Sequence, residues 1–402
     1  MIGIDIGSYK ISITSSLINN EEDMEIINSF IGASKGIKEG IIVDENELSH
    51  SLGDLLSEAV ESLENNNYIL DVGISSKNCR IVYDSLKVRI KSGKVQSQDI
   101  ENIFNSNNKV KLNYDEDIIQ KLIVDYKIDN KIVKTNIIGW QCRELTANIC
   151  YIVGNKELIQ GYNRVFNNLG YSVRKFRINI VSNRKLFLEG RLGNNLLVDI
   201  GAQTIDMGMF FNYILQELFY LSIGGENITR DISIGLKLPF KESENIKQIF
   251  SQTYKKNLLS NDNIIERVGS SKIDKNLLFE IINARIEEIL KIIIFELKKQ
   301  KCYDKIDNIV IFGDGLIYFE DIKELSYNIC RKKMLFLSPN QTYLQNSSTN
   351  SSLAIVKDMY DDLKLIYKNF TIENILTKES RKQINSNRDV ITKFKILLKE
   401  IF

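Results

Sequence analysis

The chain has 402 residues, and its 43% of apolar side chains can fill the cores of roughly two to four domains. Its 53 Lys and Arg residues balance 52 Asp and Glu residues, so the net charge of +1 gives no general attraction for nucleic acid, and we expect no nucleic-acid partner. The single histidine, His50, excludes a His-based catalytic triad or a His-rich zinc site, while five cysteines without a C-x-x-C pair and no signal-peptide pattern favour the reducing cytoplasm.

The chain opens on a pattern that predicts a β-meander, an amphipathic helix and a further strand. Asp44 precedes the helix and can cap its first N–H groups. Apolar residues then recur at helical spacing along one face, from Leu48 to Leu63. The predicted bounds are 2–6, 11–16 and 24–31 for the strands of the meander, 45–64 for the helix and 68–74 for the next strand.

A block from about residue 84 to 151 differs in pattern from the segments on either side. It combines several strands with one short helix, which is typical of a small α+β unit inserted into a larger domain. The predicted elements are strands at 86–90, 118–126, 132–135 and 143–152 and a helix at 97–104, after which a helix at 157–169 and a strand at 172–180 complete the first half.

The second half repeats the order of the first. Gly224 and Gly225 follow a second predicted meander and mark the start of a helix-rich stretch that reaches about residue 299. Two related α/β lobes, each with an insertion, are therefore predicted. The strands of this half are expected at 196–200, 205–211, 214–222, 309–312 and 334–337, with a Gly-rich turn at 313–315 and a helix at 319–330.

One short motif occurs at the beginning of both halves. Ile2-Gly-Ile-Asp-Ile-Gly-Ser-Tyr-Lys10 and Leu197-Val-Asp-Ile-Gly-Ala-Gln-Thr-Ile-Asp206 are each an apolar run followed by Asp-Ile-Gly and small or polar residues. Glycine lets such a turn approach a bound group closely, and the aspartate can face a metal ion. One copy would be explained by an ordinary hairpin with a turn aspartate, whereas two copies and the turn at 313–315 favour a phosphate and Mg²⁺ site.

This combination of motifs resembles the actin, hexokinase and Hsp70 ATPase superfamily, and within it the FtsA family of bacterial cell-division proteins. Segments 34–44, 126–129, 139–145 and 223–236 carry the same resemblance, which covers nearly the whole chain and implies an actin-like duplicated α/β fold. The implied domains are a first lobe (1A) at 1–83 plus 152–190, a 1C (SHS2-type) subdomain at 84–151, a second lobe (2A) at 191–225 plus 300–372, a helical subdomain 2B at 226–299, a linker at 373–389 and an amphipathic membrane helix at 390–402.

The resemblance also implies a site for ATP and Mg²⁺. Asp5 and Asp199 would orient Mg²⁺ through water. Glu244 and Lys247 would reach the ribose or adenine, although a solvated ion pair one helical turn apart explains them equally well. The other implied contacts are Gly7, Ser8, Tyr9 and Lys10 in the first phosphate loop, Gly201, Ala202, Gln203 and Thr204 in the second, Gly224 and Gly225 beside the sugar and phosphates, and Gly313, Asp314 and Gly315 against the adenosine.

Several positions depart from the pattern of the family. Ala202 and Gln203 interrupt a phosphate loop that usually contains a second glycine, and Asp314 puts a carboxylate into a turn that is usually made of glycines. Asn179 stands closest to the place of a glutamate beside the attacking water, and an amide cannot accept a proton as a carboxylate can. We therefore expect nucleotide binding with at most slow hydrolysis, and the sequence identifies no catalytic residue.

The segment 390–402 predicts a cationic amphipathic helix, and the polar stretch before it is typical of a flexible linker. Such a helix can lie among lipid headgroups, although a terminal helix can also dock on its own protein. The linker, the lysines and the membrane-targeting helix implied by the resemblance favour the membrane. The apolar stripe comprises Val390, Ile391, Phe394, Leu397, Leu398, Ile401 and Phe402, while Lys393, Lys395 and Lys399 take other faces.

Together these features predict a cytoskeletal adaptor. By resemblance it would polymerise with copies of itself on the cytoplasmic face of the membrane at the division site, hold FtsZ filaments through residues in 226–299 and recruit later division proteins through 84–151. Two other functions stay open at this point. One is a small-molecule kinase of the same superfamily, for which no matching catalytic segment is evident, and the other is a scaffold without nucleotide, consistent with Ala202, Gln203 and Asp314.

Overall fold

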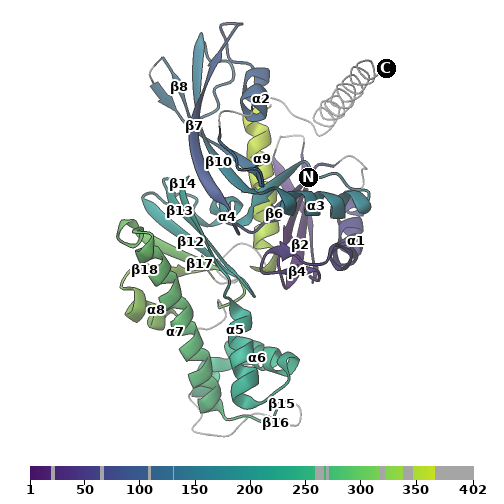
Figure 1. Cartoon of the computed structure of the whole chain (residues 1–402), viewed down its shortest axis with the longest axis vertical. Helices are drawn as coiled ribbons and strands as arrows, with labels where there is room; N and C mark the ends of the chain where they lie inside the picture. Colours follow the sequence, from purple (N-terminus) through teal and green to yellow (C-terminus); the bar gives the residue numbers. More distant parts are fainter. Residues whose placement is uncertain are drawn as a thin grey trace.

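The computed structural model of this chain describes residues 1–19, 23–63, 68–106, 110–129, 131–258, 267–268, 271–316, 322–337 and 347–366. Within these ranges lie two five-stranded sheets, a four-stranded sheet and two short hairpins, with helices packed against the sheets (Figure 1). The expected linker at 373–389 and membrane helix at 390–402 lie outside the described residues.

The first sheet contains the beginning of the chain. From one edge to the other, its strands are β11 (Lys175–Ile178), β6 (Leu70–Ile74), β1 (Ile2–Ile6), β2 (Lys10–Ile18) and β3 (Met24–Ala33). The predicted meander is confirmed, since β1 pairs antiparallel with β2 and β2 with β3, while β1 pairs parallel with β6. Every residue of β1 and β6 is buried, as expected for central strands that are covered on both faces.

The second sheet has the same topology. Its strands are β14 (Ile214–Leu221), β13 (Ile205–Phe211), β12 (Asn194–Ile200), β17 (Asn308–Phe312) and β18 (Lys333–Phe336). Here β12 pairs antiparallel with β13 and parallel with β17, as β1 does with β2 and β6. Because order and direction agree strand by strand, the predicted duplicated α/β fold is confirmed.

Two helices and a hairpin pack around the first sheet: α1 (Glu45–Glu61), α3 (Lys156–Asn168), and β4 (Ile37–Lys38) with β5 (Ile41–Ile42). The side chain of Asp44 caps α1, as predicted, and accepts the backbone N–H groups of Asn46 at 2.9 Å and Glu47 at 3.0 Å. The apolar face of α1 then becomes part of the first core, through Leu48, Leu52, Leu56 and Ala59.

The inserted unit is a separate antiparallel sheet with its own core. Its strands lie in the order β7 (Arg80–Arg89), β10 (Glu144–Asn155), β8 (Glu116–Ile128) and β9 (Lys131–Val133), and α2 (Ser97–Asn105) packs with them. The sheet begins four residues before the expected boundary at 84 and ends four residues after 151. The two strands that enter and leave the unit pair with each other along most of their length, which explains this extension.

Two helices were not predicted, and the second of them changes the division into lobes. The expected strand at 172–180 ends early, because the chain turns from β11 into α4 (Asn179–Phe187). The second helix, α9 (Asn350–Ile366), falls in the segment 300–372 that was expected in the second lobe, whereas it packs on the first sheet and on α4. Its apolar residues form a small core with the start of the chain, made of Met1, Ile69, Ile355, Val356, Met359 and Leu363.

The helical part of the second lobe extends from the second sheet and forms the lower part of Figure 1. It contains α5 (Gly225–Leu236), α6 (Phe240–Leu258), the hairpin of β15 (Arg267–Val268) and β16 (Ser271–Lys272), and α7 (Lys275–Lys299). The remaining short elements are η1 (Tyr303–Lys305), α8 (Ile322–Cys330) and η3 (Ser347–Thr349). Long α7 crosses from this part to the second sheet, and its buried isoleucines join the second core.

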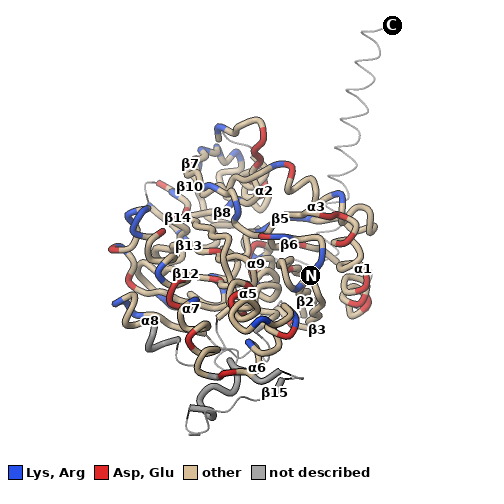
Figure 2. Tube along the Cα trace, turned by 60° about the horizontal axis from the view of Figure 1, so that its bottom comes forward, with Lys and Arg blue, Asp and Glu red and all other residues tan. Residues whose placement is uncertain are grey.

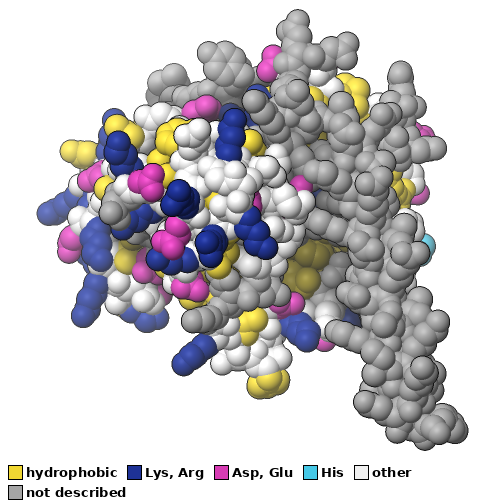
Figure 3. Space-filling model, turned by 90° about the horizontal axis from the view of Figure 1, so that it is seen from above, with side chains coloured by type: hydrophobic (Ala, Val, Ile, Leu, Met, Phe, Trp, Pro, Cys, Tyr) yellow, Lys and Arg dark blue, Asp and Glu magenta, His cyan; other side chains and the backbone are white. Residues whose placement is uncertain are grey.

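Charges of both signs are spread along the part of the trace that the structure describes (Figure 2). Seen from the side of the inserted unit, basic and acidic side chains are mixed on the surface (Figure 3). Among the residues that the structure describes, no helix has the length and hydropathy needed to cross a membrane.

Candidate nucleotide site

Two equivalent turns lie at corresponding ends of the central strands. In the first lobe the backbone N–H of Gly7 donates to the carbonyl of Lys10 at 3.0 Å, and in the second lobe Gly201 donates to Thr204 at 2.9 Å. Each turn follows a strand that carries an aspartate, Asp5 in β1 and Asp199 in β12. The sequence repeat therefore corresponds to a repeat in structure, with a carboxylate beside each turn.

The glycines after the second turn allow three loops to pack together. Gly225 donates its N–H to the carbonyl of Gly201 at 3.0 Å, and Gly315 donates to Ile200 at 2.8 Å. A Cβ on Gly224 would lie 2.6 Å from the carbonyl oxygens of Gly201 and Ala202, and a Cβ on Gly315 would lie 2.5 Å from that of Gly201. Only glycine fits these positions, so the second turn, the start of α5 and the turn after β17 form one compact unit.

Gly313 has a further reason to be glycine. Its φ is +94°, in the region that other residues rarely adopt, and a Cβ there would lie 2.4 Å from a carboxylate oxygen of Asp199. The Gly-rich turn that was expected against the adenosine thus also packs against the carboxylate of Asp199.

Asp5 is the best-defined carboxylate of the site. It is 9% exposed, and the side-chain amide of Asn179, at the start of α4, donates to its Oδ1 at 2.7 Å. Burial raises the pKa of Asp5 to about 6, although Lys10 and Asn179 act in the opposite direction. Because α4 was not predicted, neither was this contact, which places Asn179 directly beside the first aspartate.

Asp199 lies close enough to Asp5 and two other carboxylates for their charges to affect its pKa. Burial raises its pKa well above the ordinary range, and the nearby carboxylates Asp206, Asp5 and Asp314 add to this rise. Like charges that lie close together disfavour ionisation, and a divalent cation would relieve their repulsion. The oxygen atom of the Asn179 amide is buried and has no hydrogen-bond partner among the described residues. Among the described residues no three acidic, His or Cys side chains are grouped closely enough to bind a metal ion directly, so the expected contact of Asp5 and Asp199 with Mg²⁺ through water remains a prediction.

Asp206 is a site residue that was not identified from the sequence. It accepts hydrogen bonds from the backbone of Ser76 at 2.7 Å and from the hydroxyl of Ser75 at 3.1 Å, both of which follow β6 in the first lobe. Burial raises the pKa of this carboxyl too. Its strand partner is Asp199, whereas the partner of Asp5 is Ser12. This difference between the two copies was visible in the aligned repeats and could have marked Asp206.

The side chains of the two expected phosphate loops contact the β4–β5 hairpin, the solvent or the opposite lobe. The hydroxyl of Ser8 accepts the N–H of Gly40 at 3.2 Å, and Gln203 accepts the N–H of Glu39 at 2.9 Å, so both loops contact the β4–β5 hairpin. Tyr9 is 59% exposed. Lys10 reaches across to the second lobe and forms an ion pair with Asp314. A long polar side chain at Gln203 therefore adds a contact between the two lobes.

Glu244 and Lys247 of α6 form an ion pair with an N–O distance of 2.8 Å. The pair is largely buried and not solvated, because the ammonium group of Lys247 also donates to the carbonyl of Gly225 at 3.1 Å and to the hydroxyl of Thr229 at 2.9 Å. Lys247 thus ties α6 to the first turn of α5. This places the pair beside Gly224 and Gly225, and its contact with a nucleotide remains a prediction.

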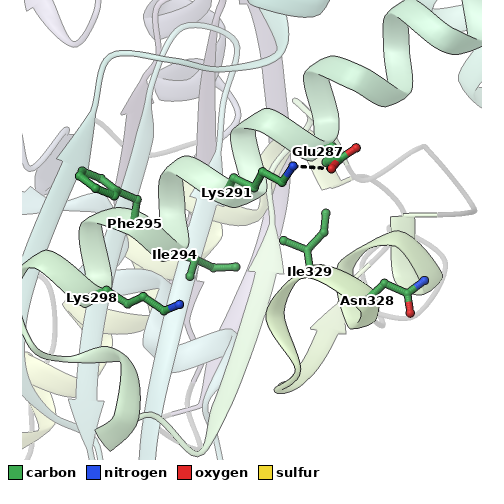
Figure 4. Close-up of a pocket in the computed structure, with 7 residues that line it drawn as sticks. All are labelled: Glu287, Lys291, Ile294, Phe295, Lys298, Asn328 and Ile329. Atoms are coloured by element: carbon green, nitrogen blue, oxygen red, sulfur yellow. Dashed lines mark ion pairs between the residues drawn. The ribbon is translucent and has the colours of Figure 1, made fainter.

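A separate groove of about 590 Å³ lies between α7 and α8, on the second lobe (Figure 4). Ile294 and Ile329 face each other from the two helices, and Lys291 is held by Glu287 at 2.5 Å. Phe295 at its edge is 68% exposed. The full lining is Glu287, Lys291, Ile294, Phe295, Lys298, Asn328 and Ile329.

Comparison with known families agrees with this architecture. The family model described as "Cell division protein FtsA" matches residues 196–354. The cell division protein FtsA of Pseudomonas aeruginosa is 23% identical over 336 residues, which cover 82% of this chain and 80% of that relative. The similarity therefore includes both lobes and the inserted unit between them.

Two solved structures have a similar fold. The PilM-PilN type IV pilus biogenesis complex matches with a TM-score of 0.57 and 11% identity, over 91% of this chain and 98% of that one. MreB5 of Spiroplasma citri, solved with bound ADP, matches with a TM-score of 0.52 and 11% identity, over 90% of this chain and 98% of that one. At these identities the two structures support the actin-like fold alone.

Proposed function

Since this chain belongs to the FtsA family of cell-division proteins and has their actin-like fold, we propose that it is an ATP-binding adaptor that polymerises on the cytoplasmic face of the membrane and tethers FtsZ filaments at the division site. The observation that carries the proposal is the pair of equivalent turns, Gly7 to Lys10 and Gly201 to Thr204, each with an aspartate beside it, buried Asp5 and half-buried Asp199. A single hairpin would not require this duplication.

The nucleotide part of the proposal rests on residues that meet at these turns. Asp5 and Asp199 would hold Mg²⁺ through water, and the two loops with Lys10 would hold the phosphates. Bound Mg²⁺ would neutralise phosphate charge at the site. The MreB5 structure with ADP supports nucleotide binding by this fold.

Hydrolysis is expected to be slow at most. Asn179 lies beside Asp5, but its amide donates a hydrogen bond to that carboxylate and cannot act as a general base. The nucleotide would then act chiefly as a structural ligand that joins the two lobes.

The membrane part of the proposal rests on the sequence of the C-terminal segment. The stripe from Val390 to Phe402 is apolar, and its other faces carry lysines that suit anionic headgroups. One short helix of this kind binds weakly, so several copies in a filament would be needed for stable attachment.

Two surfaces suit protein partners. The groove between α7 and α8, which we propose for FtsZ, combines an apolar floor with the ammonium groups of Lys291 and Lys298, and favours an acidic segment with an apolar anchor. The inserted unit exposes Tyr114, Ile132 and Trp140, which are large apolar side chains suited to contacts with later division proteins or a second copy.

Liposome sedimentation tests the adaptor function. The full chain and a version that ends at Thr377 are mixed with anionic liposomes and Mg²⁺-ATP, and the pellets are examined by electron microscopy. We expect the full chain alone to pellet and to form filaments on the lipid. Equal pelleting of both versions would contradict the membrane helix. A parallel titration with a fluorescent ATP analogue separates this function from a scaffold without nucleotide, which would show no binding at millimolar concentration.

A further inference from the structure

We propose that Asp314 competes with the phosphates of a nucleotide for Lys10, and that this ion pair must open before the nucleotide binds fully. We call the pair of Lys10 and Asp314 the carboxylate latch. The inference rests on the proposed nucleotide site and adds a regulatory contact within it.

The position of the latch is defined from both lobes. Lys10 follows the first phosphate turn and begins β2, whereas Asp314 lies in the Gly-rich turn after β17. The ammonium group contacts Asp314 Oδ2, and the two side chains are only 25% and 28% exposed. The latch therefore joins the first phosphate turn to the turn that was expected against the adenosine.

A second contact fixes the carboxylate. The hydroxyl of Ser348, in η3, donates to Asp314 Oδ2 at 3.0 Å. Since η3 leads directly into α9, which packs on the first sheet, Asp314 is held both by a residue near the start of the chain and by the segment before α9. A carboxylate with a hydroxyl donor and an ammonium partner has a defined position.

The charge of Asp314 opposes that of a nucleotide. The carboxylate of Asp314 contacts the ammonium group of Lys10 in the first phosphate loop, so it occupies the cation that a phosphate would use. A phosphate that approached Lys10 would have to replace Asp314 and would meet its repulsion. Removing the charge should therefore strengthen nucleotide binding, in contrast to the usual result of removing a polar residue from a binding site.

The backbone does not require this aspartate. Its φ is not in the positive region that constrains Gly313 next to it, so asparagine or glycine can replace it without strain. Asp314→Asn also keeps an oxygen atom that can accept the hydroxyl of Ser348. The charge can thus be tested separately from the fold.

The test is a double-mutant cycle with Mg²⁺ and a fluorescent ATP analogue. Asp314→Asn should lower the dissociation constant about tenfold, and Lys10→Ala should raise it. In the Lys10→Ala background, Asp314→Asn should have a much smaller effect, because the latch acts through Lys10. Asp304→Asn, an exposed carboxylate on the same lobe, is the control for net charge and should leave binding unchanged.

A second readout needs no nucleotide. Thermal unfolding is measured for the wild type, the two single variants and the double variant. The loss of stability in the double variant should be smaller than the sum of the losses in the two single variants, because either single change already breaks the ion pair. An Asp314→Asn variant that binds as weakly as the wild type, or more weakly, would overturn the latch while leaving the nucleotide site intact. If no version binds at millimolar nucleotide, both the latch and the proposed function are overturned.

Discussion

The carboxylate of Asp5 is buried, and loss of contact with water disfavours its charged form. Its folded pKa of about 6 lies above the ordinary value of 3.8, so the folded chain holds the proton more tightly than the unfolded chain. The contribution of this carboxyl to stability is therefore present below about pH 4 and is lost as the pH rises through about 6. A charge that lowers stability at neutral pH indicates a residue kept for a ligand.

We predict that Asp5→Asn raises the free energy of unfolding by about 1 to 3 kcal/mol near neutral pH, because it removes the buried charge. Urea denaturation between about pH 4 and 8 measures the effect, which should disappear at the acid end. The variant should also lose the stabilisation that Mg²⁺-ATP gives to the wild type. Asp54→Asn changes an exposed carboxylate of α1 and should alter neither quantity; lower stability of Asp5→Asn at neutral pH would contradict the argument.

At the scale of elements, α4 joins the two lobes, and α9 packs on the first lobe. Phe187 of α4 lies against Phe312 of β17, with ring centroids 4.3 Å apart. On the other side, α9 is attached to β11 by Arg177, which is 2% exposed and contacts the carboxylates of Asp71, Asp358 and Asp362 at 2.6 to 2.8 Å. These ion pairs hold the last described helix against the first sheet.

Replacing Arg177 by methionine should destabilise the protein by about 3 to 5 kcal/mol, because it removes the buried cation that Asp71, Asp358 and Asp362 share. Arg174, Lys175 and Arg184 remain as the other partners of these carboxylates. Arg164→Met removes an arginine of the same fold whose ion pairs with Glu45 and Glu157 are exposed, and should cost less than about 1 kcal/mol. Chemical denaturation of both variants provides the comparison. Equal losses would show that the buried network adds nothing to the attachment of α9.

At the scale of the whole molecule, two sheets of the same topology meet at a polar site. Beyond the latch, Asp206 of the second lobe is bonded to Ser75 and Ser76 of the first. The inserted unit also touches the second lobe, where the hydroxyl of Tyr83 donates to the carbonyl of Leu215. None of these junction residues lines the groove between α7 and α8, so a nucleotide bound at the junction would leave the groove uncovered.

We predict that Lys291→Glu reduces the amount of FtsZ retained on liposomes by the full chain at least about fivefold, since it reverses a charge beside the apolar floor of the groove. Co-sedimentation of FtsZ with lipid-bound protein gives the measurement. Lys299→Glu is the matched control, because this lysine is ion-paired on the same helix but does not line the groove. Equal retention by both variants would exclude the groove as the FtsZ site.

The sequence determined the duplication and the chemistry of the turns. Each Asp-Ile-Gly motif predicts a strand, a tight turn and a carboxylate beside it. These are local features, so a few neighbouring residues are enough to predict them. The meanders, the inserted unit and the cap at Asp44 follow from the same kind of signal.

Tertiary structure alone decided which distant groups meet. The position of α9 on the first sheet depends on complementary surfaces and buried ion pairs between segments separated by more than 170 residues, such as Arg177 and Asp358 at |i−j| of 181. Likewise, Asp206 meets Ser76, and Lys10 meets Asp314, because two sheets pack together. Periodicity describes which side of an element is buried, but the partner on that side is set by the fold of the whole chain.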